Sequence, residues 1–572
     1  MNYRQHYERW LASDKVDAAT KEELISIKDK DDEIKFRFIS YLAFGTGGLR
    51  GTMIAGMNAM NVYTVAHATQ GFANLILKEG KADRGVVIAH DSRNNSDLFS
   101  RVAAEVFAAN GIKVYFFDSL RPTPVLSFAI RHLGTIAGVN VTASHNPKEY
   151  NGYKAYWEDG AQLSLEQADL VSSYINATDI FDGVKRVDFD EAVKSGMIEI
   201  VGTVIDDAFM ANVTAQLIDK DAIPSIADDL KVVYTPLHGC GYRLVPETLR
   251  LCGLKHLYTV GEQMVIDGNF PTVKSPNPEY PEALSLGAKL AEKVGSDLVV
   301  ATDPDADRVG IMVRNTENKF VTITGNQVGA LLLDYILTAY ENTGTMPDKP
   351  YAVKTIVTTE LATKICRAHG IDIYNVLTGF KFIGEVIKKH DDVGNGHYLF
   401  GFEESYGYLK GTYARDKDAV VASMLIVEMA AYYKKQGMTL YDALMQMYEK
   451  FGYYNETTVN VTMPGLDGVE KMKALMNGLR KDPPTLVGGK KLIAIRDYLA
   501  ETITDVTTGK VVPTGLPASN VLYFEFEDGN VIVIRPSGTE PKIKLYLLVN
   551  GACSKCCAST LAAFKEAVES WT

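Results

Sequence analysis

Thr142-Ala143-Ser144-His145-Asn146-Pro147 is the stretch on which the interpretation of this chain depends. It follows an apolar run, Ile136 to Val141, which predicts a buried strand. Pro147 disfavours a helix at this point, so we expect a polar loop at the end of the strand. A serine held there beside an imidazole and an amide is a candidate nucleophile. Taken alone, these residues, which we call the serine loop, also fit an ordinary turn.

Short apolar runs alternate with stretches of helical spacing on both sides of the serine loop. Val86 to Ala89, Lys113 to Phe117 and Ile136 to Val141 are such runs. Their alternation predicts βαβ units and a largely parallel sheet. Ligands of such sheets bind beyond the carboxyl ends of the strands. Both the serine loop and His90-Asp91-Ser92-Arg93 fall at that edge.

Three more polar loops follow apolar runs later in the chain. We call them the aspartate loop (Asp303-Pro304-Asp305-Ala306-Asp307-Arg308), the glutamate loop (Glu403-Glu404-Ser405) and the arginine loop (Arg535-Pro536-Ser537-Gly538-Thr539). The glutamate loop could accept and donate hydrogen bonds to vicinal sugar hydroxyls, or it could begin a capped helix. The arginine loop could wrap a phosphate through charge, hydroxyls and amides, or it could be an isolated turn.

The aspartate loop predicts a metal site. Asp303, Asp305 and Asp307 alternate along an extended segment, so their carboxylates can converge, and they would repel one another without a cation between them. The sequence does not continue as an EF-hand, because Arg308 and Arg314 occupy positions that require glycine and a carboxylate. Three acidic oxygens with room for a phosphate oxygen suit Mg²⁺, and a solvated acidic turn is the alternative.

The four loops, in this order, resemble those of the α-D-phosphohexomutase family, which interconverts sugar 1-phosphates and 6-phosphates. The resemblance extends over all four quarters of the chain, and the long N-terminal segment is similar to a larger branch that includes glucose- and pentose-phosphate mutases. It implies an α/β fold of four domains around a central active-site cleft. Three related, doubly wound mixed or parallel sheets carry helices on both faces, and a C-terminal α+β domain follows. We place these domains at residues 1–203, with a helical preface, 204–320, 321–455 and 456–572.

The resemblance also implies a mechanism and a set of site residues. Ser144 would carry a phosphoryl group to the free hydroxyl of the sugar phosphate, giving a bound glucose 1,6-bisphosphate that reorients and returns its other phosphate. Glucose 1,6-bisphosphate is therefore expected as intermediate and activator, and Mg²⁺ as cofactor. The implied catalytic residues are Ser144, His145, Arg50, Lys154 and Lys417. The implied metal ligands are Ser144, Asp303, Asp305 and Asp307. The implied substrate-binding residues are Arg308, Thr378, Gly379, Lys381, Glu403, Ser405, Arg535, Ser537, Gly538 and Thr539.

On sequence alone, two of the implied catalytic residues could instead have no catalytic role. Arg50 lies in the glycine-rich stretch Phe44 to Gly51, whose amides could approach an anion closely. Arg50 stands where a dinucleotide-binding motif needs its third glycine, so that motif fails, and a plain turn remains possible. Lys154 could face the same pocket as the serine loop, although most exposed lysines face solvent.

Charge and hydropathy exclude some classes of partner. The chain of 572 residues has a net charge of −12 and no Lys/Arg run longer than a pair, so a nucleic-acid binder is not expected. The polar N-terminus does not fit a cleavable secretory signal, and no apolar run reaches bilayer length. We expect a cytoplasmic protein, monomeric or weakly dimeric, whose partners are small sugar phosphates.

The distribution of the six cysteines also fits a cytoplasmic protein. Cys240, Cys252 and Cys366 are scattered, as expected for reduced thiols. The run Cys553-Ser554-Lys555-Cys556-Cys557 contains a C-x-x-C but has no second pair and no nearby histidine, which disfavours zinc. We interpret it as a helix start with incidental thiols.

The expected reaction is the interconversion of glucose 1-phosphate and glucose 6-phosphate, because the glutamate loop resembles that of the glucose-preferring branch. A phosphomannomutase or a phosphopentomutase with the same mechanism is the alternative. A serine hydrolase built on Ser144 and His145 is disfavoured, because there is no G-x-S-x-G elbow and neighbours on an extended segment point to opposite faces. A sugar-phosphate-binding protein without turnover is the remaining possibility.

Overall fold

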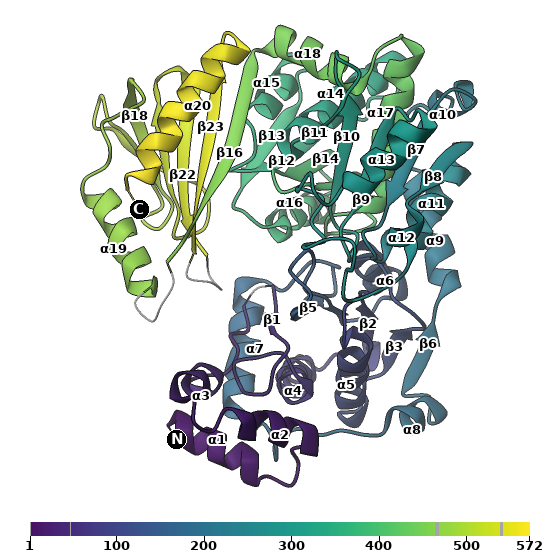
Figure 1. The fold of residues 1–572 in the computed structure, drawn as a ribbon, viewed down its shortest axis with the longest axis vertical. Coiled ribbons are helices and arrows are strands. Elements are labelled where there is room, and N and C mark those ends of the chain that lie inside the picture. Colours follow the sequence, from purple (N-terminus) through teal and green to yellow (C-terminus); the bar gives the residue numbers. More distant parts are fainter. Residues whose placement is uncertain (1, 46, 464–467, 538–541, 572) are drawn as a thin grey trace. The chain divides into compact units, whose positions relative to one another are not determined.

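The computed structural model describes residues 2–45, 47–463, 468–537 and 542–571 (Figure 1). The chain forms two compact units. The first comprises residues 1–323, 384–398 and 406–439, and the second comprises residues 324–383, 399–405 and 440–572.

The first unit begins with the predicted helical preface, α1 (Tyr3–Ala12), α2 (Ala18–Ser26) and α3 (Asp31–Phe38). Asn2 and Asp17 begin α1 and α2, and each side chain accepts a backbone N–H of the first turn, which satisfies a donor that the helix leaves unpaired. Trp10 and Phe38 pack edge to face with ring centroids 5.7 Å apart. The apolar core of the preface also includes Ala55, Met57, Ile180 and Phe181, which join it to the rest of the first unit.

A mixed sheet follows in the order β1-β5-β4-β2-β3-β6. Strands β4, β2, β3 and β6 are parallel to one another, and β5 pairs antiparallel with both β4 and β1. The strands are β1 (Leu49–Thr52), β2 (Val86–His90), β3 (Val114–Phe117), β4 (Ala137–Val141), β5 (Tyr150–Trp157) and β6 (Ile198–Val201). The helices are α4 (Val62–Lys78), the 3₁₀ turn Ala82–Arg84, α5 (Ser96–Ala109), α6 (Thr123–Leu133), α7 (Leu165–Ala177) and α8 (Phe189–Lys194).

Every residue of β2 and β4 is buried, since α5 and α6 both pack against these strands. Parallel strands covered by helices read as continuous apolar runs rather than alternating ones, which explains why both were visible in the sequence. The predicted parallel core of this sheet is therefore confirmed.

A second mixed sheet of the first unit has the order β11-β10-β9-β7-β8. Strands β9, β7 and β8 are parallel, and β10 pairs antiparallel with both β9 and β11. The strands are β7 (Lys231–Thr235), β8 (His256–Thr259), β9 (Leu298–Thr302), β10 (Val309–Arg314) and β11 (Phe320–Ile323). The remaining elements of the unit are α9 (Thr203–Thr214), α10 (Ala222–Ser225), α11 (Gly241–Leu251), α12 (Gly261–Met264), α13 (Ser285–Val294), β15 (Gly407–Leu409) and α17 (Ala419–Lys435).

The second unit starts with α14 (Gly325–Thr343), and β12 lies between β13 and β14 in its first sheet. The other elements of this part are β12 (Pro350–Thr355), α15 (Leu361–Ala368), β13 (Asp372–Val376), α16 (Phe380–Val393), β14 (His397–Glu403) and α18 (Leu440–Phe451). Strands β12 and β13 are parallel. The chain passes between the units within α16 and β14.

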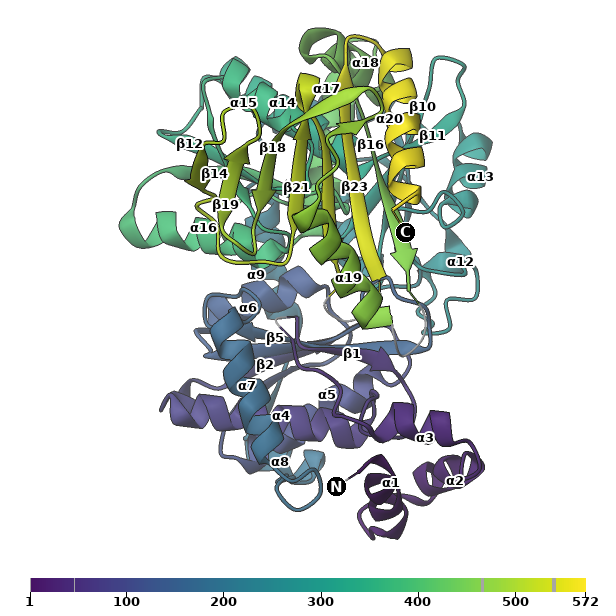
Figure 2. The ribbon, with the colours of Figure 1, turned by 90° about the vertical axis from the view of Figure 1, so that its left-hand side faces the viewer.

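The last part of the second unit is an antiparallel sheet in the order β16-β23-β22-β21-β18-β19-β20, with β17 paired to β18. Helices α19 and α20 flank this sheet (Figure 2). The strands are β16 (Tyr453–Thr462), β17 (Leu486–Val487), β18 (Lys490–Asp497), β19 (Thr502–Asp505), β20 (Val511–Pro513), β21 (Leu522–Phe526), β22 (Asn530–Pro536) and β23 (Lys542–Gly551). The helices are α19 (Gly468–Lys481), the 3₁₀ turn Glu527–Gly529 and α20 (Ser554–Glu569).

Strand β22 explains how this sheet is held on both faces. Ile532 and Ile534 belong to the core formed with α19 and α20, whereas Val531 and Val533 belong to a second core shared with Ile356, since side chains alternate along a strand. The chain therefore has the expected α/β architecture of mixed sheets, followed by an α+β part. Among the described residues, no helix combines the length and apolar character needed to span a bilayer.

Candidate active site

The serine loop starts where β4 ends, and its serine is not extended. Ser144 has φ +51°, a left-handed conformation that few serines adopt. Its backbone N–H donates to Thr142 Oγ1 at 2.9 Å, and its Oγ lies 3.2 Å from His145 Nδ1. The expectation that these two side chains point to opposite faces is wrong, because it assumed an extended backbone.

The hydroxyl of Ser144 instead donates its proton to a carboxylate. Its Oγ lies 2.7 Å from Asp303 Oδ2, so the nitrogen of His145 faces an oxygen lone pair. Burial lowers the pKa of His145 well below its ordinary value, and the positive charges of Arg308 and Arg50 lower it further. Because the Ser144 hydroxyl donates to Asp303 and not to His145, the two residues do not form the serine–histidine pair of a hydrolase.

A buried arginine holds the serine loop in place. Arg93, 4% exposed, donates to the carbonyl oxygens of Ser144 (2.5 Å) and Asn146. It also donates to those of Pro147 (2.9 Å) and Tyr150 (3.1 Å). These bonds fix the carbonyl groups on both sides of the serine and maintain its unusual conformation.

Asp91 completes this support. Its carboxylate lies 3.3 Å from Arg93 Nε and accepts a hydrogen bond from the Thr142 hydroxyl at 2.6 Å. The Thr142 hydroxyl oxygen in turn accepts a hydrogen bond from the backbone N–H of Ser144. The network was missed at the level of sequence. Its one signal was the position of Asp91 and Arg93 directly after a parallel strand.

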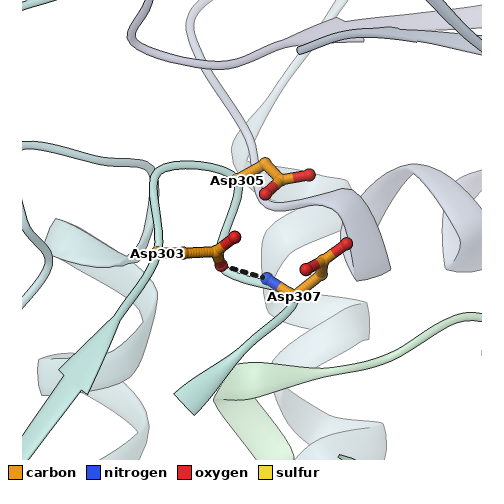
Figure 3. A group of neighbouring side chains, drawn as sticks. All are labelled: Asp303, Asp305 and Asp307. Atoms are coloured by element: carbon orange, nitrogen blue, oxygen red, sulfur yellow. Dashed lines mark hydrogen bonds between the residues drawn. The ribbon is translucent and has the colours of Figure 1, made fainter. Parts of the chain in front are cut away.

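The aspartate loop connects β9 to β10, and Figure 3 shows its carboxylates directed toward a common region. One oxygen from each of Asp303, Asp305 and Asp307 lies within 4.8 Å of the others, and all three residues are buried. Asp303 Oδ1 accepts the backbone N–H of Asp307 at 3.1 Å (Figure 3) and that of Arg308 at 3.0 Å. Ala306 has φ +49° and turns the loop back on itself.

Two lysines neutralise part of this negative charge. Lys154 Nζ lies 2.7 Å from Asp305 Oδ2 and 3.0 Å from Asp307 Oδ2, and Lys417 Nζ lies 3.3 Å from the same oxygen of Asp307. Lys154 is buried, so it is not one of the solvent-facing lysines that its sequence left possible.

The pKa values of the cluster follow from burial and from these ion pairs. Burial raises the pKa of Asp303, and Asp305 and Asp307 raise it further. Burial acts the same way on Asp307, but Lys154 and Lys417 outweigh it and lower its pKa. Burial lowers the pKa of Lys154, whereas Asp305 and Asp307 raise it more, so this lysine remains protonated.

The cluster fits a hard divalent cation. In the described part of the chain, the Oδ1 atoms of Asp305 and Asp307 are buried without a hydrogen-bond partner. Thr123 donates to the other oxygen of Asp305 at 2.7 Å and orients that carboxylate. Carboxylate oxygens beside a hydroxyl are ligands that Mg²⁺ prefers. These residues could therefore hold a metal ion.

Two arginines lie near these groups. Arg50, at the edge of the first sheet, donates to Asn146 Oδ1 at 3.2 Å. Arg308 pairs with Glu279 at 2.7 Å, and its Nε lies 3.9 Å from Asp307 Oδ1. The first unit thus brings together Ser144, His145, Arg50, Lys154, Lys417, Asp303, Asp305, Asp307 and Arg308.

The second unit contains the glutamate loop at the end of β14. Glu403 Oε1 accepts the backbone N–H of Gly379 at 3.0 Å. The Thr378 hydroxyl is buried, and no partner for it occurs among the described residues. Lys381 is also buried and lies 4.9 Å from the centre of the Phe382 ring. This unit therefore places Thr378 and Gly379 next to the glutamate loop.

Glu404 is the next residue of that loop. Burial and the charge of Glu403 raise its pKa to about 7, against the opposing effects of Lys544 and Arg535. One of its carboxylate oxygens is buried, and no hydrogen-bond partner for it occurs within the described ranges. Ser405 follows it and is partly exposed.

The arginine loop lies at the end of β22. Arg535 donates to the Tyr546 hydroxyl at 3.3 Å, and the Ser537 amide donates to the Lys542 carbonyl at 2.7 Å. Gly538 and Thr539, which the sequence placed in a phosphate-binding loop, lie outside the described residues.

The fold and the first-unit cluster define a class of protein. A serine hydroxyl lies against carboxylates able to hold a divalent cation, at the carboxyl ends of strands in an α/β fold. Such arrangements suit phosphoryl transfer, in which positioning and charge neutralisation do most of the catalytic work.

Comparison with known proteins identifies the family. The domain models of phosphoglucomutase/phosphomannomutase match in order: α/β/α domain I at residues 41–180, domain II at 207–317, domain III at 324–451 and the C-terminal domain at 459–548. A phosphoglucomutase of Staphylococcus haemolyticus is 37% identical over 520 residues, which cover 90% of this chain and 91% of the relative. The chain therefore belongs to the phosphoglucomutase/phosphomannomutase family, and it is an isomerase of the phosphohexomutase type.

Solved structures share the fold. The open form of parafusin, a phosphoglucomutase from Paramecium, has a TM-score of 0.68 at 20% identity, covering 93% of this chain and 94% of that one. A phosphoglucomutase/phosphomannomutase family protein from Burkholderia thailandensis has a TM-score of 0.64 at 18% identity, covering 92% and 97%.

Proposed function

We propose that the protein interconverts glucose 1-phosphate and glucose 6-phosphate, in a Mg²⁺-dependent reaction that passes through a phosphoserine enzyme and glucose 1,6-bisphosphate. The name and the extent of the Staphylococcus relative support the choice of glucose. The observation that carries the mechanism is the 2.7 Å contact between Ser144 Oγ and Asp303, inside a group of carboxylates able to hold a metal.

Ser144 is the residue that gives and receives the phosphoryl group. Attack by a sugar hydroxyl on the phosphoserine forms the new P–O bond and breaks the bond to Ser144 Oγ. Asp303, Asp305 and Asp307 would hold Mg²⁺, which when bound offsets the negative charge of the transferring phosphoryl group. The loop orients these carboxylates through its own amides, so little rearrangement is needed during transfer.

Proton transfer accompanies each half of the reaction. Lys154, held protonated by two carboxylates, is suited to give a proton to Ser144 Oγ when that oxygen leaves. Lys417 shares Asp307 with it and is the second proton carrier in this proposal. Neutral His145, together with Arg50 and Arg308, surrounds the phosphoryl group with donors.

The second unit supplies recognition of the sugar and of its other phosphate. Glu403 accepts hydrogen bonds from the sugar hydroxyls, and Ser405 both accepts and donates them, as expected for the glutamate loop. The arginine loop, with Arg535, Ser537, Gly538 and Thr539, binds the distal phosphate. Thr378, Gly379 and Lys381 complete the set of substrate-binding residues. We assign one loop to each domain: the serine loop to residues 1–203, the aspartate loop to 204–320, the glutamate loop to 321–455 and the arginine loop to 456–572.

We also propose that the protein acts in the cytoplasm, as a monomer or a weak homodimer, on small soluble sugar phosphates. Cys240, Cys252 and Cys366 are free and buried, which is compatible with a reducing compartment. Sedimentation across a range of protein concentrations tests the oligomeric state, and a tight oligomer at the lowest concentration would contradict it.

A substrate panel tests the proposed reaction. Purified protein is incubated with Mg²⁺, a trace of the matching bisphosphate, and either glucose 1-phosphate, mannose 1-phosphate or ribose 1-phosphate. The proposal predicts the highest kcat/KM for glucose 1-phosphate. Preferential turnover of the mannose or ribose compound would retain the mechanism and overturn the substrate, and absence of turnover with all three would contradict the reaction.

A further inference from the structure

The start of α20 carries a group of cysteines that the proposed reaction does not use. Cys553 precedes the helix as its cap, and a disulfide joins it to Cys556. The sequence had suggested incidental thiols at a helix start. The helix start is confirmed, but these two sulfurs are bonded to each other. Cys557, next in the chain, is 2% exposed and keeps a free thiol.

The bonded pair differs from the other cysteines in access. Cys556 is exposed and Cys553 is partly exposed, whereas Cys240, Cys252, Cys366 and Cys557 are buried. A reductant from solution can therefore reach the disulfide without prior opening of the core. Burial also raises the pKa of the Cys557 thiol, which makes that cysteine a poor competitor for exchange.

The helix start favours Cys553 as the leaving sulfur. The backbone N–H of Cys556 donates to Cys553 Sγ at 3.1 Å. A thiolate at this position would keep that hydrogen bond and would gain from the positive end of the helix dipole. Thiolates stabilised in this way leave more readily in disulfide exchange.

The pair also lies at a structurally sensitive place. Helix α20 packs along β23 and β16 (Figure 1), and Tyr453, the first residue of β16, pairs with Gly551 at the end of β23. The Cys557 thiol donates to the Tyr453 carbonyl at 3.3 Å. A Cβ atom on Gly551 would come within 3.2 Å of Cys557 Sγ and 3.6 Å of Cys556 Cβ. The cysteines thus lie where the chain enters its last sheet.

We propose that Cys553 and Cys556 form a thiol–disulfide exchange site whose reaction partner is a dithiol reductant. A thiolate of the reductant attacks Sγ of the exposed residue Cys556, and the bond to Cys553 breaks as Cys553 leaves as a thiolate. The second thiolate of the reductant then attacks the mixed disulfide and releases Cys556. The reductant is oxidised to its disulfide, two electrons pass to the protein, and both released thiolates take up protons. The inference does not depend on the proposed mutase reaction.

A metal site is the competing interpretation of three neighbouring cysteines. Among the described residues, the one group of His, Cys, Asp and Glu side chains with metal-binding geometry is that of Asp303, Asp305 and Asp307. The geometry at α20 therefore favours exchange over metal binding, and the experiment includes a metal arm.

The test is a redox titration of the full chain. The protein is equilibrated in buffers of different ratios of reduced to oxidised dithiothreitol, alkylated under native conditions, and digested for mass spectrometry. Exchange predicts that Cys553 and Cys556 become alkylated together, with one shared midpoint, while Cys557 stays unlabelled. Alkylation of both residues at every ratio, or separate midpoints for the two, would overturn the proposal.

Two serine variants and one metal arm sharpen the result. Cys553→Ser is expected to leave Cys556 reactive at all ratios, whereas Cys557→Ser, the matched control, should keep the wild-type midpoint. Loss of the shared midpoint in Cys557→Ser would show that Cys557 takes part in the disulfide, and this would refute the proposal. Protection of all three cysteines that requires Zn²⁺, is removed by a chelator and ignores the redox ratio would also refute it.

Discussion

Ser144 has a backbone conformation that costs a non-glycine residue roughly 1–2 kcal/mol. That cost is offset by the surrounding bonds, because Arg93 donates to carbonyl groups on both sides of the serine. Such strain at a reactive residue fits a position in which the hydroxyl must point at a particular group. Here that group is Asp303.

Arg93→Lys keeps the positive charge but cannot bond to all these carbonyls at once. The serine loop should then shift, and a displacement of this kind can lower the rate by about 100-fold. We expect kcat for glucose 1-phosphate to fall on the order of 10- to 100-fold, with a much smaller change in KM, because Arg93 supports Ser144 rather than the sugar. Steady-state kinetics measure both. A changed KM with an unchanged kcat would show that Arg93 acts in binding.

Glu404 gives a prediction about pH. Its pKa is raised from an ordinary 4.5 to about 7 by burial and by Glu403, so between these values the folded protein retains a proton that the unfolded chain releases. The free energy of unfolding should therefore fall as the pH rises from 4.5 to 7 and level off above. Glu404→Gln removes this contribution, and the variant should gain about 1–3 kcal/mol over wild type across that window.

Thermal melting of wild type and Glu404→Gln at closely spaced pH values measures this effect. Groups such as Glu456, whose pKa burial also raises to about 7, are present in both proteins and cancel in the difference. A difference in Tm that is independent of pH would rule out the proton uptake assigned to Glu404.

At the scale of elements, the aspartate loop packs on the turn that follows β7. A Cβ atom on Gly239 would lie 2.4 Å from Pro304 Cα and 2.6 Å from its carbonyl oxygen, closer than unbonded atoms approach. The Cys240 amide donates to that same carbonyl at 2.8 Å. The position of the carboxylates therefore depends on a glycine in the neighbouring turn.

Gly239→Ala should displace the aspartate loop and cost roughly 1–3 kcal/mol of stability, as overpacking usually does. Metal affinity should fall together with stability. Gly261→Ala is the matched control, since a Cβ atom there meets nothing within 4 Å. Calorimetric melting and Mg²⁺ titration compare the two variants, and equal effects of both substitutions would contradict the packing argument.

The metal assignment makes a separate prediction for Asp305→Asn. Loss of one carboxylate charge should weaken Mg²⁺ binding at least on the order of 10- to 100-fold and lower activity at limiting Mg²⁺. Asp297→Asn, which removes an aspartate paired with Lys434 elsewhere in the first unit, should leave affinity unchanged. Isothermal titration of both variants provides the comparison, and unaltered affinity in Asp305→Asn would exclude it as a ligand.

Strands and loops that follow simple rules could be predicted from sequence. The apolar runs that became β2 and β4 are buried on both faces, and each polar loop lies at the end of a strand, as expected for an α/β fold. The left-handed serine could not be predicted, because it is imposed by Arg93, which lies about fifty residues away in the chain. Similarly, the pairing of Lys154 with Asp305 and Asp307 is created by tertiary contact, and local sequence carries no signal for it.

At the scale of the whole molecule, the family match extends from residue 41 to residue 548, so all four loops lie within the matched domains. Each of the two units holds part of the residues that the proposed reaction uses. The first carries the serine, the carboxylates and the lysines, and the second carries Glu403, Ser405 and Arg535. The proposed reaction requires both sets of residues, whereas metal binding requires those of the first unit.

The central claim is that Ser144 carries the phosphoryl group. The most direct measurement is peptide mass spectrometry of the protein after brief incubation with glucose 1,6-bisphosphate and Mg²⁺, before and after addition of glucose 1-phosphate. The account predicts one added phosphoryl group on the peptide that contains Ser144, lost when the sugar phosphate is added, and absent in Ser144→Ala. A phosphoryl group on another residue, or full turnover by Ser144→Ala, would contradict it.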